Sequence, residues 1–124
     1  MNFKTTLIAS TLISSSFLVT IPASANEQLA ASLCDYVAAD DKKRLRKKLK
    51  ESRVKLRNIF SGVTCSGNNL LRHAMKNNAD GTGKFIVKKL PKSDLAAGGD
   101  VDWAAENGHS DSPIVAGIKA RAGI

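Results

Sequence analysis

Apolar residues recur at helical spacing along much of the chain. Residues 27–39 place apolar side chains three or four positions apart, among alanines that favour helix. These positions predict a first helix and its buried face: Leu29, Leu33, Tyr36 and Val37.

Residues 41–60 predict a second helix with a single narrow apolar stripe. Asp40 would be its N-cap, and Asp41 falls in the first turn, where a carboxylate suits the helix dipole. Gly62 provides a stop signal. The stripe covers about 100° of the helix surface and consists of Leu45, Leu49, Leu56, Ile59 and Phe60.

The pattern after Cys65 predicts two more short helices. Ser66 or Asn68 can cap a helix that extends to about Asn77, and a turn is expected over residues 80–83. The apolar run at 85–90 predicts a short helix or a strand-like segment, of which we favour the helix, and Pro91 ends it.

The remaining chain has a different character. Residues 93–118 contain five carboxylates, no Lys or Arg and few large apolar side chains, which favours a loosely ordered tail with a short helix near 114–122. We therefore predict a small all-α domain over residues 26–91, a bundle of three or four short helices, followed by a mostly flexible Ala/Gly/Asp-rich tail over residues 92–124.

The first 25 residues have the pattern of a secretory signal peptide. Lys4 precedes a mostly apolar stretch over residues 7–21, and small residues at Ala23 and Ala25 suit signal peptidase. The stretch is shorter than the roughly 20 residues that a membrane-spanning helix needs. We expect cleavage after Ala25, a mature chain without a transmembrane segment, and a periplasmic or secreted location.

An exported chain would hold Cys34 and Cys65 in an oxidising compartment, which favours a structural disulfide between them. A redox or nucleophilic pair is the alternative, although the chain has no Cys-x-x-Cys motif. A continuous helix over 41–60, about 30 Å long, packed antiparallel on the first helix would keep the cysteines too far apart for a bond. We expect either a break near Ser52 or a first helix that does not pack along the second.

Positive charge is concentrated in one segment. The 124-residue chain has 19 Lys and Arg against 11 Asp and Glu, a net charge of +8, and residues 42–57 contain ten of these cations with Glu51 as their only carboxylate. A solvated helix face is one interpretation, but alternating signs would give solubility with less repulsion between neighbours. We favour a surface that binds an anionic partner through Lys43, Arg46, Lys47, Lys50, Arg53 and Arg57.

The partner is expected to be the anionic envelope surface, as lipopolysaccharide or phospholipid, or an acidic protein. Export argues against nucleic acid. The alternative function is a structural or adaptor protein, in which the basic helix pairs with its own acidic tail or with a second copy.

Neither catalysis nor a cofactor is expected. The sequence has no glycine-rich phosphate loop and no nucleophile motif. The residues that could bind zinc, Cys34, Cys65, His73 and His109, lack the short ligand spacings of such sites, so we expect no metal.

Three runs of sequence carry a family resemblance: Leu-Cys-Asp-Tyr at 33–36, Leu-Arg-Lys-Lys-Leu-Lys-Glu-Ser-Arg at 45–53 and Cys-Ser-Gly-Asn-Asn-Leu-Leu-Arg-His-Ala at 65–74. The chain resembles, from about Leu33 to Leu90, a family of small exported proteins of Gram-negative bacteria known as domain of unknown function 3718. The resemblance implies an exported single-domain protein in which Cys34 and Cys65 are paired. It implies no activity and therefore no catalytic residues.

Residues 67–74 followed by 85–87 are also similar to the helix pair of one ankyrin repeat, and residues 104–109 resemble the middle of such a repeat, 30 positions after Ala74. The Thr-Pro-Leu-His turn is absent, and Pro113 stands where a second helix would run. Because an array needs about three stacked units, we expect one helix pair at 68–90 and no repeat array.

Overall fold

The computed structural model describes residues 23–124, so the predicted signal peptide lies outside the described residues except for its last three positions. Every regular element in this range is helical, which confirms the all-α class. The elements are α1 (Ala23–Ala38), α2 (Lys42–Glu51), α3 (Leu56–Ile59), the 3-10 helix η1 (Phe60–Gly62), α4 (Leu70–Lys76), α5 (Asp80–Lys89), α6 (Lys92–Ala97), α7 (Asp100–Glu106) and α8 (Pro113–Ala122).

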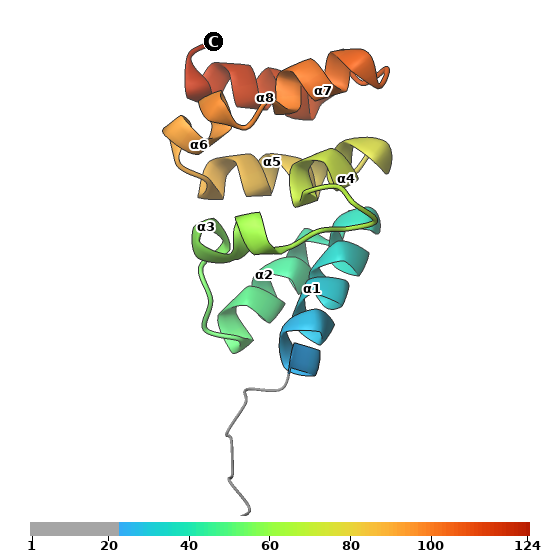
Figure 1. Cartoon of the computed structure of the whole chain (residues 1–124), viewed down its shortest axis with the longest axis vertical. Helices are drawn as coiled ribbons and strands as arrows, with labels where there is room; N and C mark the ends of the chain where they lie inside the picture. Colours follow the sequence, from blue (N-terminus) through green and yellow to red (C-terminus); the bar gives the residue numbers. More distant parts are fainter. Residues whose placement is uncertain (1–22) are drawn as a thin grey trace, which may run out of the picture.

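Three helix hairpins follow one another along the chain: α1 with α2, α4 with α5, and α7 with α8 (Figure 1). Each reverses direction at a residue with positive φ, namely Asp40, Asn78 and Gly108. In each turn the next amide donates to a carbonyl five residues earlier, which closes the helix end in the same way each time. These bonds are Asp41 N to Tyr36 O at 2.8 Å, Ala79 N to Ala74 O at 2.8 Å, and His109 N to Ala104 O at 2.7 Å.

The hairpins stack so that equivalent helices touch. The first helices form one row, in which α1 contacts α4 and α4 contacts α7, and the second helices form another, in which α2 contacts α5 and α5 contacts α8. The stack runs along the long axis of Figure 1, with α1 and α2 at one end and α7 and α8 at the other. The helix pair predicted at 68–90 is confirmed as α4 and α5. The prediction that Pro113 prevents a second helix from pairing with residues 104–109 is wrong, because Pro113 lies in the first turn of α8, where proline is tolerated.

A polar cluster joins the first hairpin to the second. The Asp40 carboxylate accepts a hydrogen bond of 2.8 Å from the backbone amide of Thr82, in the first turn of α5. The buried Thr82 hydroxyl donates to the carbonyl of Val37 at 3.1 Å. Asp40 was predicted to cap the second helix. That prediction is wrong, because Asp41 caps α2 and Asp40 is directed to α5.

A second polar cluster joins the middle hairpin to the last. Asp100 is only 2% exposed, and its Oδ1 accepts from Arg72 Nε at 2.9 Å and from Asn69 Nδ2 at 2.8 Å. The Arg72 guanidinium also lies 5.5 Å from the centre of the Trp103 ring, a cation–π distance. Charge-assisted bonds of this kind are stronger than neutral ones, so the cluster fixes α7 on α4.

We expect Asp100→Asn to lower the free energy of unfolding by about 2 kcal/mol, because the substitution removes the charge that both donors face. Urea unfolding followed by circular dichroism measures the change. Asp102→Asn is the matched control, since Asp102 is exposed on the same helix; equal losses in both variants would contradict the role given to Asp100.

The predicted helix over 41–60 is interrupted, as the disulfide geometry required. α2 ends at Glu51, Ser52 is its C-cap, and Arg53 adopts a positive φ of 53° before α3 begins at Leu56. The break lets the chain turn back, and Cys34 and Cys65 form a disulfide with their Cα atoms 5.7 Å apart. Both the break near Ser52 and the structural disulfide are confirmed.

The prediction of a mostly flexible tail over residues 92–124 is wrong. Helix α7 packs on α4, α8 packs on α5, and α6 packs on α8. The side chains of Leu95, Ala104, Ile114 and Ile118 are fully or almost fully buried. The predicted short helix near 114–122 is α8.

The turn predicted at residues 80–83 is also wrong, because this sequence forms the first turn of α5. Glycine is required there by packing: a Cβ on Gly83 would overlap the buried Ile114 side chain and lie 3.4 Å from the Cβ of Ala74. Residues that resemble turn formers thus provide the contact between the middle and last hairpins.

Candidate anion-binding groove

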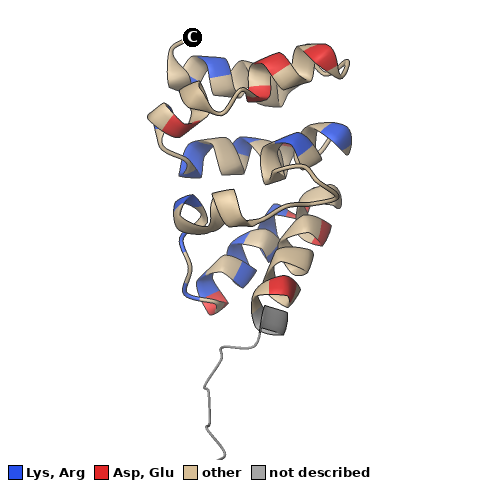
Figure 2. Cartoon of the chain, viewed as in Figure 1, with Lys and Arg blue, Asp and Glu red and all other residues tan. Residues whose placement is uncertain are grey.

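Helix α2 is held to the protein by one face and carries cations on the rest of its surface. Asp41 accepts a hydrogen bond of 3.0 Å from the amide of Arg44 and caps the helix, and Leu45 and Leu49 are buried against the neighbouring α1 and α5. In the segment 42–57 every Lys and Arg is exposed except Lys48, which is half-buried. Figure 2 shows the resulting concentration of positive charge on α2 and the chain up to α3.

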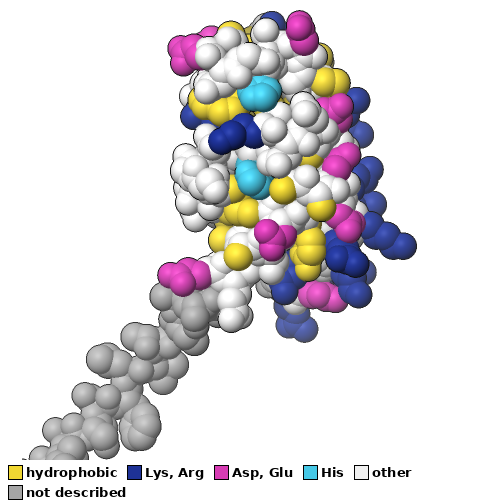
Figure 3. Space-filling model, turned by 90° about the vertical axis from the view of Figure 1, so that its right-hand side faces the viewer, with side chains coloured by type: hydrophobic (Ala, Val, Ile, Leu, Met, Phe, Trp, Pro, Cys, Tyr) yellow, Lys and Arg dark blue, Asp and Glu magenta, His cyan; other side chains and the backbone are white. Residues whose placement is uncertain are grey.

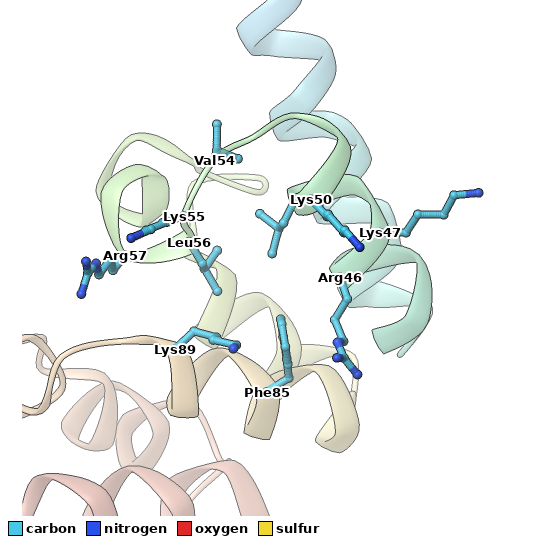
Figure 4. A pocket seen from close by; sticks show the side chains of 10 residues that line it. Arg46, Lys47, Lys50, Val54, Lys55, Leu56, Arg57, Phe85 and Lys89 are labelled. Atoms are coloured by element: carbon cyan, nitrogen blue, oxygen red, sulfur yellow. The ribbon is translucent and has the colours of Figure 1, made fainter.

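A groove lies between α2, α3 and α5, with a volume of about 670 Å³. We call it the basic groove. Figure 4 shows its lining, with Leu56 and Phe85 directed into it and Lys47 extended away from it. The lining residues are Arg46, Lys47, Leu49, Lys50, Val54, Lys55, Leu56, Arg57, Phe85 and Lys89.

The basic groove has a positive rim and an apolar floor. Leu49, Leu56 and Phe85 are buried with 8%, 4% and 9% of their surface still exposed. Lys89 Nζ lies 5.5 Å from the centre of the Phe85 ring, where the face of the ring attracts the ammonium group. The groove can therefore offer both apolar contact and positive charge to the same ligand.

Little of this charge is neutralised by the protein. Two ion pairs involve residues 42–57, which we call the basic segment: Arg44 with Asp41 at 3.4 Å, and Lys47 with Glu51 at 3.8 Å. Within residues 23–124, the other five cations of the groove make no ion pair, and no lining residue is acidic. The groove is thus a region of uncompensated positive potential, which attracts anions.

The residues predicted to bind an anion fall in three places. Arg46, Lys47, Lys50 and Arg57 line the basic groove. Lys43 lines a smaller neighbouring hollow of about 350 Å³ together with Lys42 and Arg46. Arg53 is exposed on the connection between α2 and α3 and lies outside the groove lining.

The groove is also lined by two lysines and one aromatic residue that were not predicted to bind a partner. Lys55 belongs to the same basic run but was not among the predicted binding residues. Lys89 and Phe85 lie on α5, about thirty residues further along the chain. Nothing in the local sequence connects α5 with α2, because the two helices meet only through the stacking of the first two hairpins.

The basic segment does not pair with the acidic tail of its own chain. The acidic helix α7 packs on α4 and α8, at the opposite end of the stack from α2 (Figure 2), and Asp100 is paired with Arg72. The predicted pairing of the basic helix with the acidic tail of the same chain is therefore wrong.

The two histidines lie away from the basic groove. His73 Nε2 is 3.1 Å from the carbonyl oxygen of Cys34, beside the disulfide, and the His109 ring stacks on Trp103 with the centroids 5.6 Å apart. Figure 3 shows both on a face with few cations, while Lys and Arg gather along one edge. Among the described residues, no group of three or more His, Cys, Asp or Glu is arranged to hold a metal ion, and no helix has the length and apolar character needed to cross a membrane.

Comparison with known proteins identifies one family. A family described as "Protein of unknown function (DUF3718)" matches residues 33–97, which contain both cysteines, the basic segment and all of α5. No curated protein and no solved structure matches the chain.

Proposed function

Since the chain belongs to the DUF3718 family, whose description gives no activity, we propose a function from its own surface. It is an exported, non-catalytic binding module, and its basic segment docks on the anionic phospholipid surface of the cell envelope.

The observation that carries this proposal is the uncompensated charge of residues 42–57. Ten cations with a single carboxylate extend from α2 to α3, and nine of the ten are exposed. Each Lys or Arg near an anionic membrane contributes about 1 kcal/mol. Four or five of them facing the surface together are enough for weak, reversible attachment.

Two features support a location outside the cytoplasm. Residues 1–25 have the sequence pattern of a signal peptide, and Cys34 and Cys65 form a disulfide, a bond that persists in oxidising compartments. We place the mature protein in the periplasm or the secreted fraction, where anionic lipid headgroups are available and nucleic acid is a poor candidate.

We expect residues 26–124 in the oxidised form to co-sediment with vesicles of phosphatidylglycerol and phosphatidylcholine and to stay in the supernatant with phosphatidylcholine alone. Raising the ionic strength to about 0.15 M should weaken the apparent affinity by about tenfold or more, because salt screens exposed charges. Protein in the pellet is quantified by gel at a series of lipid concentrations.

Failure to pellet with anionic vesicles at low salt would contradict the proposal. Binding to poly-glutamate without binding to vesicles would favour the acidic-protein partner instead. Equal pelleting with both vesicle types would show that charge is not the basis of attachment.

A further inference from the structure

We infer that the basic groove binds the headgroup and first acyl carbons of one anionic phospholipid. The inference rests on the proposed function and adds a discrete site to it. A charged helix face alone would bind a membrane through diffuse attraction, whereas the groove would select and hold a single lipid molecule.

The apolar floor favours a lipid over a simple polyanion. A hydrated polyanion needs cations only, but the groove exposes parts of Leu49, Leu56 and Phe85 beneath its rim. An acyl chain that covers these surfaces removes them from water, which is favourable in proportion to the area covered. The volume of about 670 Å³ lies in the range of sites for small ligands.

The positive rim favours an anionic lipid over a neutral one. Arg46 and Lys50 on α2 face Lys89 on α5 across the groove (Figure 4), and in residues 23–124 none of the three makes an ion pair. These like charges repel one another, and a phosphate between them would relieve the repulsion. A trimethylammonium headgroup would add a fourth cation to the same region.

Lys89 can distinguish binding in the groove from general attraction to residues 42–57. It lies outside residues 42–57, and its ammonium is placed over the Phe85 ring. The neighbouring Lys88 is also exposed on the same helix but lines a different hollow, between α5 and α8. Lys88 and Lys89 carry the same charge on the same helix but line different hollows, so Lys88 is the matched control for Lys89.

The test is a titration of the oxidised chain, residues 26–124, with dihexanoyl phosphatidylglycerol below its micelle-forming concentration, followed by amide chemical shifts. We expect saturable shifts in α2, α3 and α5, with dihexanoyl phosphatidylcholine causing none. Inorganic phosphate separates a headgroup effect from a lipid effect, and it should bind at least about tenfold more weakly because it makes no contact with the floor.

Lys89→Gln should weaken binding of the short-chain lipid by about fivefold, while Lys88→Gln leaves it unchanged. Preserved amide spectra in both variants show that the fold is intact. Equal effects of the two substitutions, shifts outside the groove, or equal affinity for inorganic phosphate would overturn the inference. Vesicle binding without saturable binding of the short-chain lipid would overturn the groove site and leave the proposed function standing, whereas a chain that pellets with no vesicle would overturn the proposed function itself.

Discussion

A chain that ends at Leu90 is expected to lose cooperative folding. Residues after Leu90 provide Leu95, Ile114, Val115 and Ile118, all buried against the rest of the protein. Burial of each such side chain is worth about 1.5–3 kcal/mol. Their combined loss is about as large as the total stability of a small domain, which is about 5–15 kcal/mol.

Thermal unfolding followed by circular dichroism measures this effect, with the dispersion of methyl signals in proton NMR as a second readout. A chain that lacks only Ile124 is the control, because that side chain is 61% exposed and its loss should leave the transition unchanged. A sigmoidal transition at the full-length temperature in the chain that ends at Leu90 would contradict the account of the tail as part of the core.

Removal of the disulfide should have the next largest effect. The bond joins α1 to the loop between η1 and α4 across a sequence separation of 31 residues. Loop-closure entropy assigns roughly 3–4 kcal/mol to a loop of this length. We expect the double variant Cys34→Ala with Cys65→Ala to lose about that much stability in urea unfolding, with the basic groove loosened because α3 lies within the closed loop.

Reduction of the wild-type chain by dithiothreitol provides an independent check. It should lower the urea midpoint to that of the double variant, and it should have no effect on the double variant itself. A loss of less than about 1 kcal/mol in both experiments would mean that the hairpin stack holds the two segments together without the bond.

The helices of the first half of the chain could be predicted because their apolar positions are periodic, but their boundaries could not, since Asp41 and not Asp40 caps α2. The break near Ser52 followed from a physical constraint, since an unbroken helix would hold Cys34 and Cys65 apart. The tail could not be predicted by the same means. Its contacts depend on Gly83, whose lack of a Cβ leaves room for the Ile114 side chain, and small residues also occur in flexible segments.

The three hairpins resemble one another more in their turns than in the apolar residues of their helices. Asn77 and Asn107 each donate a side-chain hydrogen bond of 2.8 Å to the carbonyl four residues earlier, so the ends of α4 and α7 are alike. The second helices differ in sequence, with Phe85 in α5 and Pro113 at the start of α8. Because α8 lacks the apolar pattern of α5 and begins with Pro113, the sequence wrongly indicates that no second helix pairs with residues 104–109.

Only those residues of the candidate site that are close together in the sequence could be predicted. Charge patterning identifies the cations of α2 and α3 because they are neighbours in sequence. Lys89 and Phe85 reach the same groove through the packing of the second hairpin on the first, and no local pattern marks them. A ligand site formed between stacked units becomes visible only once the stack is known.

Binding of residues 42–57 to an anionic membrane surface is the property on which the proposed function depends most. Its most direct test is co-sedimentation with phosphatidylglycerol vesicles at low salt of a variant in which Arg46, Lys47, Lys50 and Arg53 are all replaced by glutamine. The control replaces four exposed lysines elsewhere by glutamine, Lys76, Lys84, Lys92 and Lys119, and changes the net charge equally. We expect binding to fall by about a hundredfold or more in the first variant and by much less in the control. Equal losses in both would show that attachment follows net charge alone, and would contradict a docking surface on α2 and its connection to α3.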